Sequence, residues 1–337
     1  MKRTGYIDVA RGISIVLVVM GHESGYFGSI PSASFHSMVS STRLPLFFFL
    51  SGLFLMGDTS SCTHLRKRTK TILLPYLITL TAVWFLGKMW PLSANYDLVA
   101  IAYGAGNLLG WPWSPCWFLP HLWLASVLTH PAANTGVFRS ASQLRRYVYC
   151  AAIAGAGVIV MGIRWTDVIP GFYFFTRNGL PLGLDLVLFT SAYMLLGAGL
   201  KARVLSLEPN IRLLMATAFI CMVVISLFPG GGLDLNQRTI LMPAATLALS
   251  LAGIYWVLGL AWLIDHEWSW AAEGARLIGQ NSLYILMFHG YVYDSMMLSM
   301  DGMSYVYQKA LASTSCILIP TGAGYVGKRM ASWVHSG

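Results

Sequence analysis

The sequence predicts an all-α protein, a polytopic bundle of about ten transmembrane helices that forms a single domain over residues 1–337. Two features of the composition lead to this fold class. Hydrophobic residues make up 56% of the chain and charged residues only 10%, whereas a soluble domain carries roughly 25% charged residues. Apolar runs close to the ~20 residues needed to cross the hydrocarbon core also recur along the whole chain.

The expected spans are the apolar runs themselves, in chain order. We predict them at residues 7–26, 36–57, 71–89, 115–131, 147–163, 182–200, 211–228, 239–264, 278–297 and 304–327. This assignment places 16 of the 22 Lys and Arg residues on the side of the N-terminus and 6 on the other side. Because basic residues concentrate in cytoplasmic loops, we expect both termini to be cytoplasmic.

The net charge and the cysteines limit the kinds of partner and site that we expect. The net charge of +9 reflects the same asymmetry, and it indicates anionic lipid headgroups rather than nucleic acid as partners. The five cysteines are scattered and odd in number. They therefore predict neither a disulfide framework nor a metal site.

The first span carries ionisable residues on one face. Arg11 and His22 are eleven residues apart, which at about 100° per residue is within about 20° of three full helical turns, and Asp8 shares that face. Ionisable side chains inside a bilayer are costly and mark functional paths by default. The alternative is a buried polar pair that only holds helices together. From residue 7 to residue 22 the helix rises about 22 Å, so we expect Arg11 near the inner face and His22 in the outer half.

The second span opens with Arg43, at a depth that we expect to be close to that of His22. Pro45 and the pair Ser51-Gly52 indicate an irregular helix, with the proline in the first turn and a break in mid-span. Simple helix packing would explain Ser51-Gly52 equally well.

Ahead of the third span, the segment His64–Lys70 holds five basic or potentially basic residues. Such a cytoplasmic segment suits a polyphosphate ligand, but an ordinary positively charged loop is an equal alternative. Trp117–Leu122 begins the fourth span. In the ninth span, Ser282 and His289 are seven residues apart and share a face.

Five blocks of the sequence, in this order, resemble the integral-membrane acyltransferase-3 family. They are Asp8–Ile13 with Gly21-His22, Arg43–Gly52, the basic segment ending at Pro75, Trp117–Leu119, and Ser282–Ile285 with His289. Members of this family move acyl groups from acyl-coenzyme A onto extracytoplasmic sugars. The resemblance implies a multi-pass enzyme of the bacterial cytoplasmic (inner) membrane, with acetyl-coenzyme A as acyl donor, a glycan or glycolipid as acceptor, and no metal.

The resemblance also implies roles for individual residues. His22 and Arg11 match the family's histidine and arginine, so both are expected to be catalytic. The family's basic element is matched imperfectly, because Thr69 follows Arg66 at plus three while Lys67 and Lys70 keep that spacing. We expect the coenzyme to contact Arg66, Lys67, Arg68, Lys70 and Arg11, and the acceptor to contact Arg43, Glu23 and His289.

A thioester and an alcohol react through a base that takes the alcohol proton, or through a nucleophile that first takes the acyl group. A neutral histidine can do either, so both roles remain open for His22. Glu23 points about 100° away from His22 on a helix, and it is not expected to orient that ring. The main alternative class is a secondary transporter, because transporters also use broken helices and ionisable residues inside the membrane.

Overall fold

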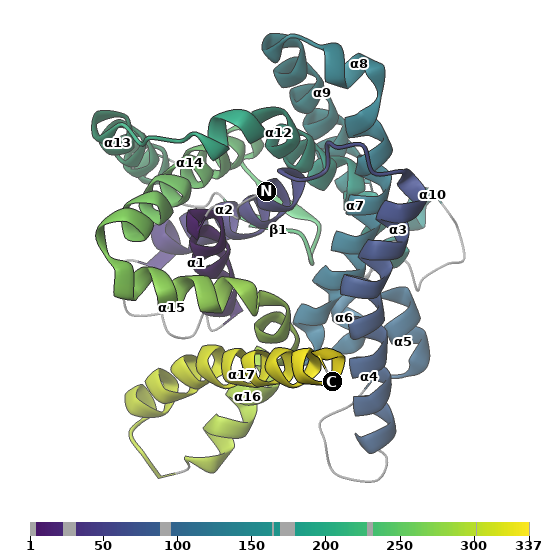
Figure 1. Ribbon diagram of the computed structural model, residues 1–337, viewed down its shortest axis with the longest axis vertical. Helices are drawn as coiled ribbons and strands as arrows, with labels where there is room; N and C mark the ends of the chain where they lie inside the picture. Colours follow the sequence, from purple (N-terminus) through teal and green to yellow (C-terminus); the bar gives the residue numbers. More distant parts are fainter. Residues whose placement is uncertain are drawn as a thin grey trace. The chain divides into compact units, whose positions relative to one another are not determined.

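The computed structural model describes residues 5–22, 32–87, 96–163, 165–168, 179–227, 232–300 and 302–336. These residues are helical apart from loops and one short β-hairpin (Figure 1). They group into two compact units. The expectation of a single domain stays a prediction.

The first unit comprises Met1–Leu44, Leu207–Gly232 and Ala244–Gly337. Its helices are α1 (Gly5–His22), the first part of α2 (Ser32–Gly52), α13 (Ile211–Leu227), α14 (Pro243–Glu267), α15 (Ser269–Gln280), α16 (Ser282–Ser299) and α17 (Tyr305–Ser336).

The second unit comprises Pro45–Ser206 and Leu233–Pro243. Besides the end of α2, its longer helices are α3 (Ser61–Arg68), the π-helix η1 (Thr69–Leu73), α4 (Leu74–Gly87), α7 (Phe118–Asn134), α9 (Gln143–Met161) and α12 (Val187–Leu205). Its short elements are α5 (Leu98–Tyr103), α6 (Gly106–Leu109), α8 (Gly136–Ser140), α10 (Trp165–Val168) and the 3-10 helices η2 (Ser114–Trp117) and η3 (Pro181–Leu186). The hairpin strands are β1 (Gly232–Asp234), whose first residue falls in the first unit, and β2 (Thr239–Leu241).

The protein is a multi-pass, all-α membrane protein. Among the described residues, six helices are long and apolar enough to cross a membrane. A helix overlaps each of the ten predicted ranges, but the count of ten spans and the cytoplasmic position of the termini stay predictions.

Glycines bring the helices of the first unit close together. The backbone of Gly12 in α1 lies against the carbonyl of Ala275 in α15, and Gly279 in α15 lies against the carbonyl of Asp8, so a Cβ at either glycine would overlap its neighbour. Figure 1 also shows α16 and α17 running side by side. Helix backbones approach this closely only where the side chains are small.

The course of α2 differs from the prediction. Pro45 lies inside the helix rather than in its first turn, and Ser51-Gly52 ends the helix rather than breaking it. The proline has no N–H, so the carbonyl of Ser41 loses its helical donor. The hydroxyl of Ser250 in α14 donates to that carbonyl at 2.5 Å, which explains how the helix continues through the proline. Gly52 packs against the backbone of Met194.

The basic segment, placed ahead of the third span by the sequence, is helical and not a loop. Residues 61–87 form one continuous helical run through α3, η1 and α4. The Ser60 side chain caps α3 by accepting a hydrogen bond from the Thr63 N–H at 3.3 Å. Such a cap favours a helix start at this point, and the basic residues therefore lie on a helix.

The β-hairpin was not predicted. It begins at Gly232, between the predicted spans 211–228 and 239–264, and β2 occupies the start of the second of these spans. As a result α14 begins at Pro243.

Candidate active site

The polar face of α1 begins with an ion pair. Asp8 is buried, and its carboxylate lies 3.3 Å from the guanidinium of Arg11 one turn later. The side-chain amide of Gln280 in α15 donates to the other carboxylate oxygen at 3.3 Å. A buried carboxylate with two donors is a satisfied group. Asp8 thus holds Arg11 in one orientation, with a quarter of the arginine side chain exposed.

At the other end of α1, His22 faces His289 of α16. The centroids of the two imidazole rings are 5.4 Å apart and their planes are tilted by 40°. His22 is partly exposed, and His289 is buried. The sequence placed both residues on membrane helices, and the fold of the first unit brings the two rings together.

The hydrogen bonds of His289 fix its tautomer. Its Nδ1 lies 2.9 Å from the carbonyl oxygen of Ile285 and 3.0 Å from that of Leu286. Carbonyl oxygens only accept hydrogen bonds, so Nδ1 carries the proton and Nε2 of the neutral ring is an acceptor. This Nε2 is buried and has no hydrogen-bond partner among the described residues.

Arg43 of α2 completes this group. Its guanidinium lies against the backbone of Gly21, where a Cβ would overlap it, and its charge acts on both His22 and His289. The Ser14 hydroxyl of α1 donates to the backbone carbonyl of Arg43 at 3.2 Å. A cation beside two imidazoles can stabilise negative charge that develops on a reacting carbonyl oxygen.

The basic segment belongs to the second unit. Arg66, Lys67 and Lys70 are exposed on one helical run, and Arg68 is half-buried. His64, in contrast, points inward. It is buried, its Nε2 lies 3.0 Å from the Ser126 hydroxyl, and its ring stacks on His130 of α7 with 4.1 Å between centroids. His64 therefore does not belong to the exposed cationic surface.

The predicted site residues thus fall into two groups. Arg11, His22, Arg43 and His289 lie in the first unit, and the cations Arg66–Lys70 lie in the second. Glu23, which we expected to contact the acceptor, lies outside the described residues.

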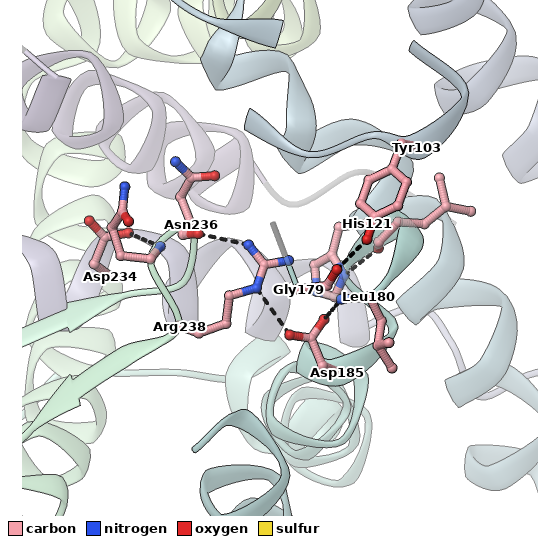
Figure 2. Close-up of polar contacts among 10 residues, drawn as sticks. Tyr103, His121, Gly179, Leu180, Asp185, Asp234, Asn236 and Arg238 are labelled. Atoms are coloured by element: carbon pink, nitrogen blue, oxygen red, sulfur yellow. Dashed lines mark hydrogen bonds and ion pairs between the residues drawn. The ribbon is translucent and has the colours of Figure 1, made fainter. Parts of the chain in front are cut away.

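A polar network in the second unit was missed by the sequence analysis (Figure 2). Asp185 of η3 is buried and pairs with Arg238 of the β1–β2 turn, with 3.0 Å between Nε and the carboxylate. The N–H of Leu180 donates to the same carboxylate at 3.2 Å. The Tyr103 hydroxyl donates to the carbonyl of Gly179. Burial raises the pKa of Tyr103 to about 12, so this hydroxyl stays protonated as a donor.

This network ties the loop at residues 179–186 to the hairpin and to α5. Gly179 has a φ of 66°, and a Cβ there would overlap the guanidinium of Arg238, so the position requires glycine. Asp185 lies inside the predicted span 182–200. An acidic residue inside a predicted span is the sequence signal that could have indicated this network. Here the residue forms a structural ion pair.

Comparison with known proteins identifies the family. The family model described as an acyltransferase domain, Acyl_transf_3, matches residues 4–318, which is nearly the whole chain. No curated protein and no solved structure matched. The match confirms the resemblance carried by the blocks around His22, Arg43 and His289, and the chain belongs to the acyltransferase-3 family of membrane acyltransferases.

Proposed function

We propose that this protein is a membrane O-acyltransferase that moves an acetyl or other short acyl group from acetyl-coenzyme A, at the cytoplasmic face, to a hydroxyl of an extracytoplasmic glycan. One observation carries the proposal. In a member of an acyltransferase family, two histidines and an arginine converge at one end of α1, with 5.4 Å between the imidazole rings. The membrane would be the bacterial cytoplasmic membrane, and the acceptor an O-antigen, capsule or exopolysaccharide.

The residues match what acyl transfer needs. The attacking hydroxyl must lose a proton, and the thioester carbonyl gains negative charge as it is attacked. His22 is the candidate base or nucleophile. Arg43 is the candidate for stabilising the carbonyl oxygen, because its positive charge acts on both histidines.

The donor would bind through its phosphates. Coenzyme A carries a pyrophosphate and a 3′-phosphate, and Arg and Lys side chains form charge-assisted hydrogen bonds with such groups. Arg66, Lys67 and Lys70 offer three exposed cations on one helical run, and Arg68 adds a half-buried fourth. Arg11, oriented by Asp8, would contact the extended arm of the coenzyme on its way to His22.

A secondary transporter would also explain charged residues inside the membrane. It would not explain membership in a family of acyltransferases. We therefore favour the enzyme.

The test compares bacteria that express this protein with bacteria that express its His22→Ala variant. Mass spectrometry of the surface glycan should find base-labile acetyl esters only with the wild-type protein. The purified wild-type protein should also release free thiol from acetyl-coenzyme A when that glycan is added. Wild-type protein that adds no ester and releases no thiol would overturn the proposal.

A further inference from the structure

The buried imidazole of His289 has a ring nitrogen, Nε2, that is positioned to accept a proton. It is 1% exposed, and its Nδ1 donates to the backbone carbonyls of Ile285 and Leu286. Its Nε2 therefore presents a lone pair to the interior, with no donor for it among the residues that the structure describes. A buried acceptor without a donor is costly, so a substrate hydroxyl that donates to this Nε2 would satisfy it.

Other contacts hold α16, the helix that carries this ring, in place. The Cys316 thiol of α17 donates to the backbone carbonyl of His289 at 3.1 Å, and α16 and α17 pack side by side. Cys316 and His289 are both buried. Nε2 of His289 is thus fixed in position before any ligand binds, as a proton acceptor in an active site must be.

His22 differs from His289 in exposure. His22 is the last residue of α1 and is partly exposed, so a thioester can reach it. The centroids of the two rings are 5.4 Å apart. Among the described residues, Nε2 of His289 makes no hydrogen bond, to His22 or to any other group. A hydroxyl oxygen that attacks an acyl group on His22 would therefore be close to Nε2 of His289.

We propose that the two histidines divide the reaction, with His22 carrying the acyl group and His289 acting as general base for the acceptor. This assignment rests on the proposed function. In the first step a ring nitrogen of His22 attacks the thioester carbonyl, a C–N bond forms, the C–S bond breaks, and coenzyme A leaves as thiolate.

In the second step the acceptor hydroxyl attacks the acyl carbon and gives its proton to Nε2 of His289. The new C–O bond forms, the C–N bond breaks, and His22 returns to the neutral imidazole. The proton on His289 then passes to the released thiolate through solvent. The sum is thioester plus alcohol giving ester plus thiol. Arg43 stabilises the carbonyl oxygen in both steps through its positive charge.

The two steps can be measured separately. If the acetyl group moves from acetyl-coenzyme A to His22 and back, it can pass to a second molecule of coenzyme A when no acceptor is present. Purified protein mixed with acetyl-coenzyme A and deuterium-labelled coenzyme A should therefore form labelled acetyl-coenzyme A, which mass spectrometry detects. The second step is measured as acetyl ester on the surface glycan of the expressing bacteria.

His289→Asn is the informative variant. The asparagine amide can still donate to the helical carbonyls as Nδ1 does, but it has no atom that takes a proton at the position of Nε2. We expect the variant to keep exchange within threefold of wild type and to lose ester formation by at least about 100-fold, the lower range for a general base. His22→Ala should lose both activities. His266→Asn, at an exposed histidine of α14, should lose neither.

Each contrary result has its own meaning. If His289→Asn forms ester at the normal rate, His289 is not the general base and its role is structural. His289→Asn that loses exchange as well as ester formation would overturn the division of labour. Wild-type protein that forms ester without exchange would overturn the acyl-histidine. Wild-type protein with neither activity would instead contradict the proposed function.

Discussion

The imidazole of His289 in α16 faces that of His22 at the end of α1, with 5.4 Å between the ring centroids. The two residues come from opposite ends of the sequence, and the packing of α1 on α15 and α16 brings them together. Arg43 of α2 lies against Gly21, next to the same pair. Three helices of the first unit therefore contribute one side chain each to the candidate active site.

His22→Ala should reduce acyl transfer by at least 10²–10⁴-fold, the usual contribution of a general base, while the protein remains folded and inserted. The side chain lies at the end of a helix and is partly exposed, so its loss leaves no large cavity. Release of coenzyme A thiol measures the activity, and gel filtration in detergent checks the fold. Transfer within tenfold of wild type would rule out a chemical role.

Neutralising Arg66 and Arg68 together by Arg66→Gln and Arg68→Gln should raise the KM for acetyl-coenzyme A by at least about tenfold. A hydrogen bond to a charged group contributes roughly 1.5–3 kcal/mol, and these side chains are the proposed phosphate contacts. The matched control is Arg145→Gln, at an exposed cation of α9 in the same unit, which should leave KM unchanged. Equal affinities of wild type and the double variant in a direct binding measurement would mean that the segment serves topology alone.

Gly279→Ala should destabilise the first unit, because the added Cβ would overlap the backbone carbonyl of Asp8 in α1. Backbone cannot move aside as a side chain can, so we expect a cost at or above the ~1–3 kcal/mol of ordinary overpacking. Gly274→Ala in the same helix meets no atom within 4 Å and should be neutral or gain up to about 1 kcal/mol in helix propensity. Thermal unfolding in detergent measures both, and equal midpoints would contradict the close contact.

Arg238→Ala should destabilise the second unit by about 3–5 kcal/mol, because it leaves the buried Asp185 carboxylate without its cation. The exposed pair Arg139–Asp58 is the control, with 45% and 98% of the side chains exposed. Arg139→Ala should change stability by less than about 1 kcal/mol. Similar unfolding midpoints for the two variants would show that the network of Figure 2 contributes little.

The sequence predicts best what depends on helix periodicity. Asp8 and Arg11 were placed on one face of the first span, and they form an ion pair there. Trp117 and Phe118 mark the start of α7 as expected. These are local properties, since the helical repeat alone decides which side chains share a face.

Tertiary contacts and local conformation were harder to predict. Nothing in the spacing of His289 indicates that its ring meets His22, because this depends on how α1, α15 and α16 pack. An ordinary loop was one of two alternatives for the basic segment, because the positive-inside rule reports the side of the membrane and not the conformation. The Ser60 cap in fact starts a helix there. Asp185 of η3 pairs with Arg238 of the hairpin turn, a contact that no pattern within one span could indicate.

The last prediction concerns the side from which the donor binds, and Cys62 provides a native marker for it. Cys62 is exposed on α3, one turn before Arg66, whereas Cys116, Cys150, Cys221 and Cys316 are buried. If the basic segment is cytoplasmic, a membrane-impermeant maleimide should label the protein in inside-out vesicles and not in intact cells. Cys62→Ser should abolish that labelling, because the remaining thiols are covered by the fold.

The same inside-out vesicles test the transfer itself. Acetyl-coenzyme A added outside them reaches the cytoplasmic face only, and it should acetylate glycan enclosed in the lumen. Vesicles of the opposite orientation, identified by unlabelled Cys62, should transfer nothing from external donor. Labelling of Cys62 in intact cells would mean that the predicted topology is inverted. Transfer that occurs only when donor and acceptor are both on the cytoplasmic side would mean that the glycan is acylated before export. The basic segment and His22 would then be reached from the same face of the membrane.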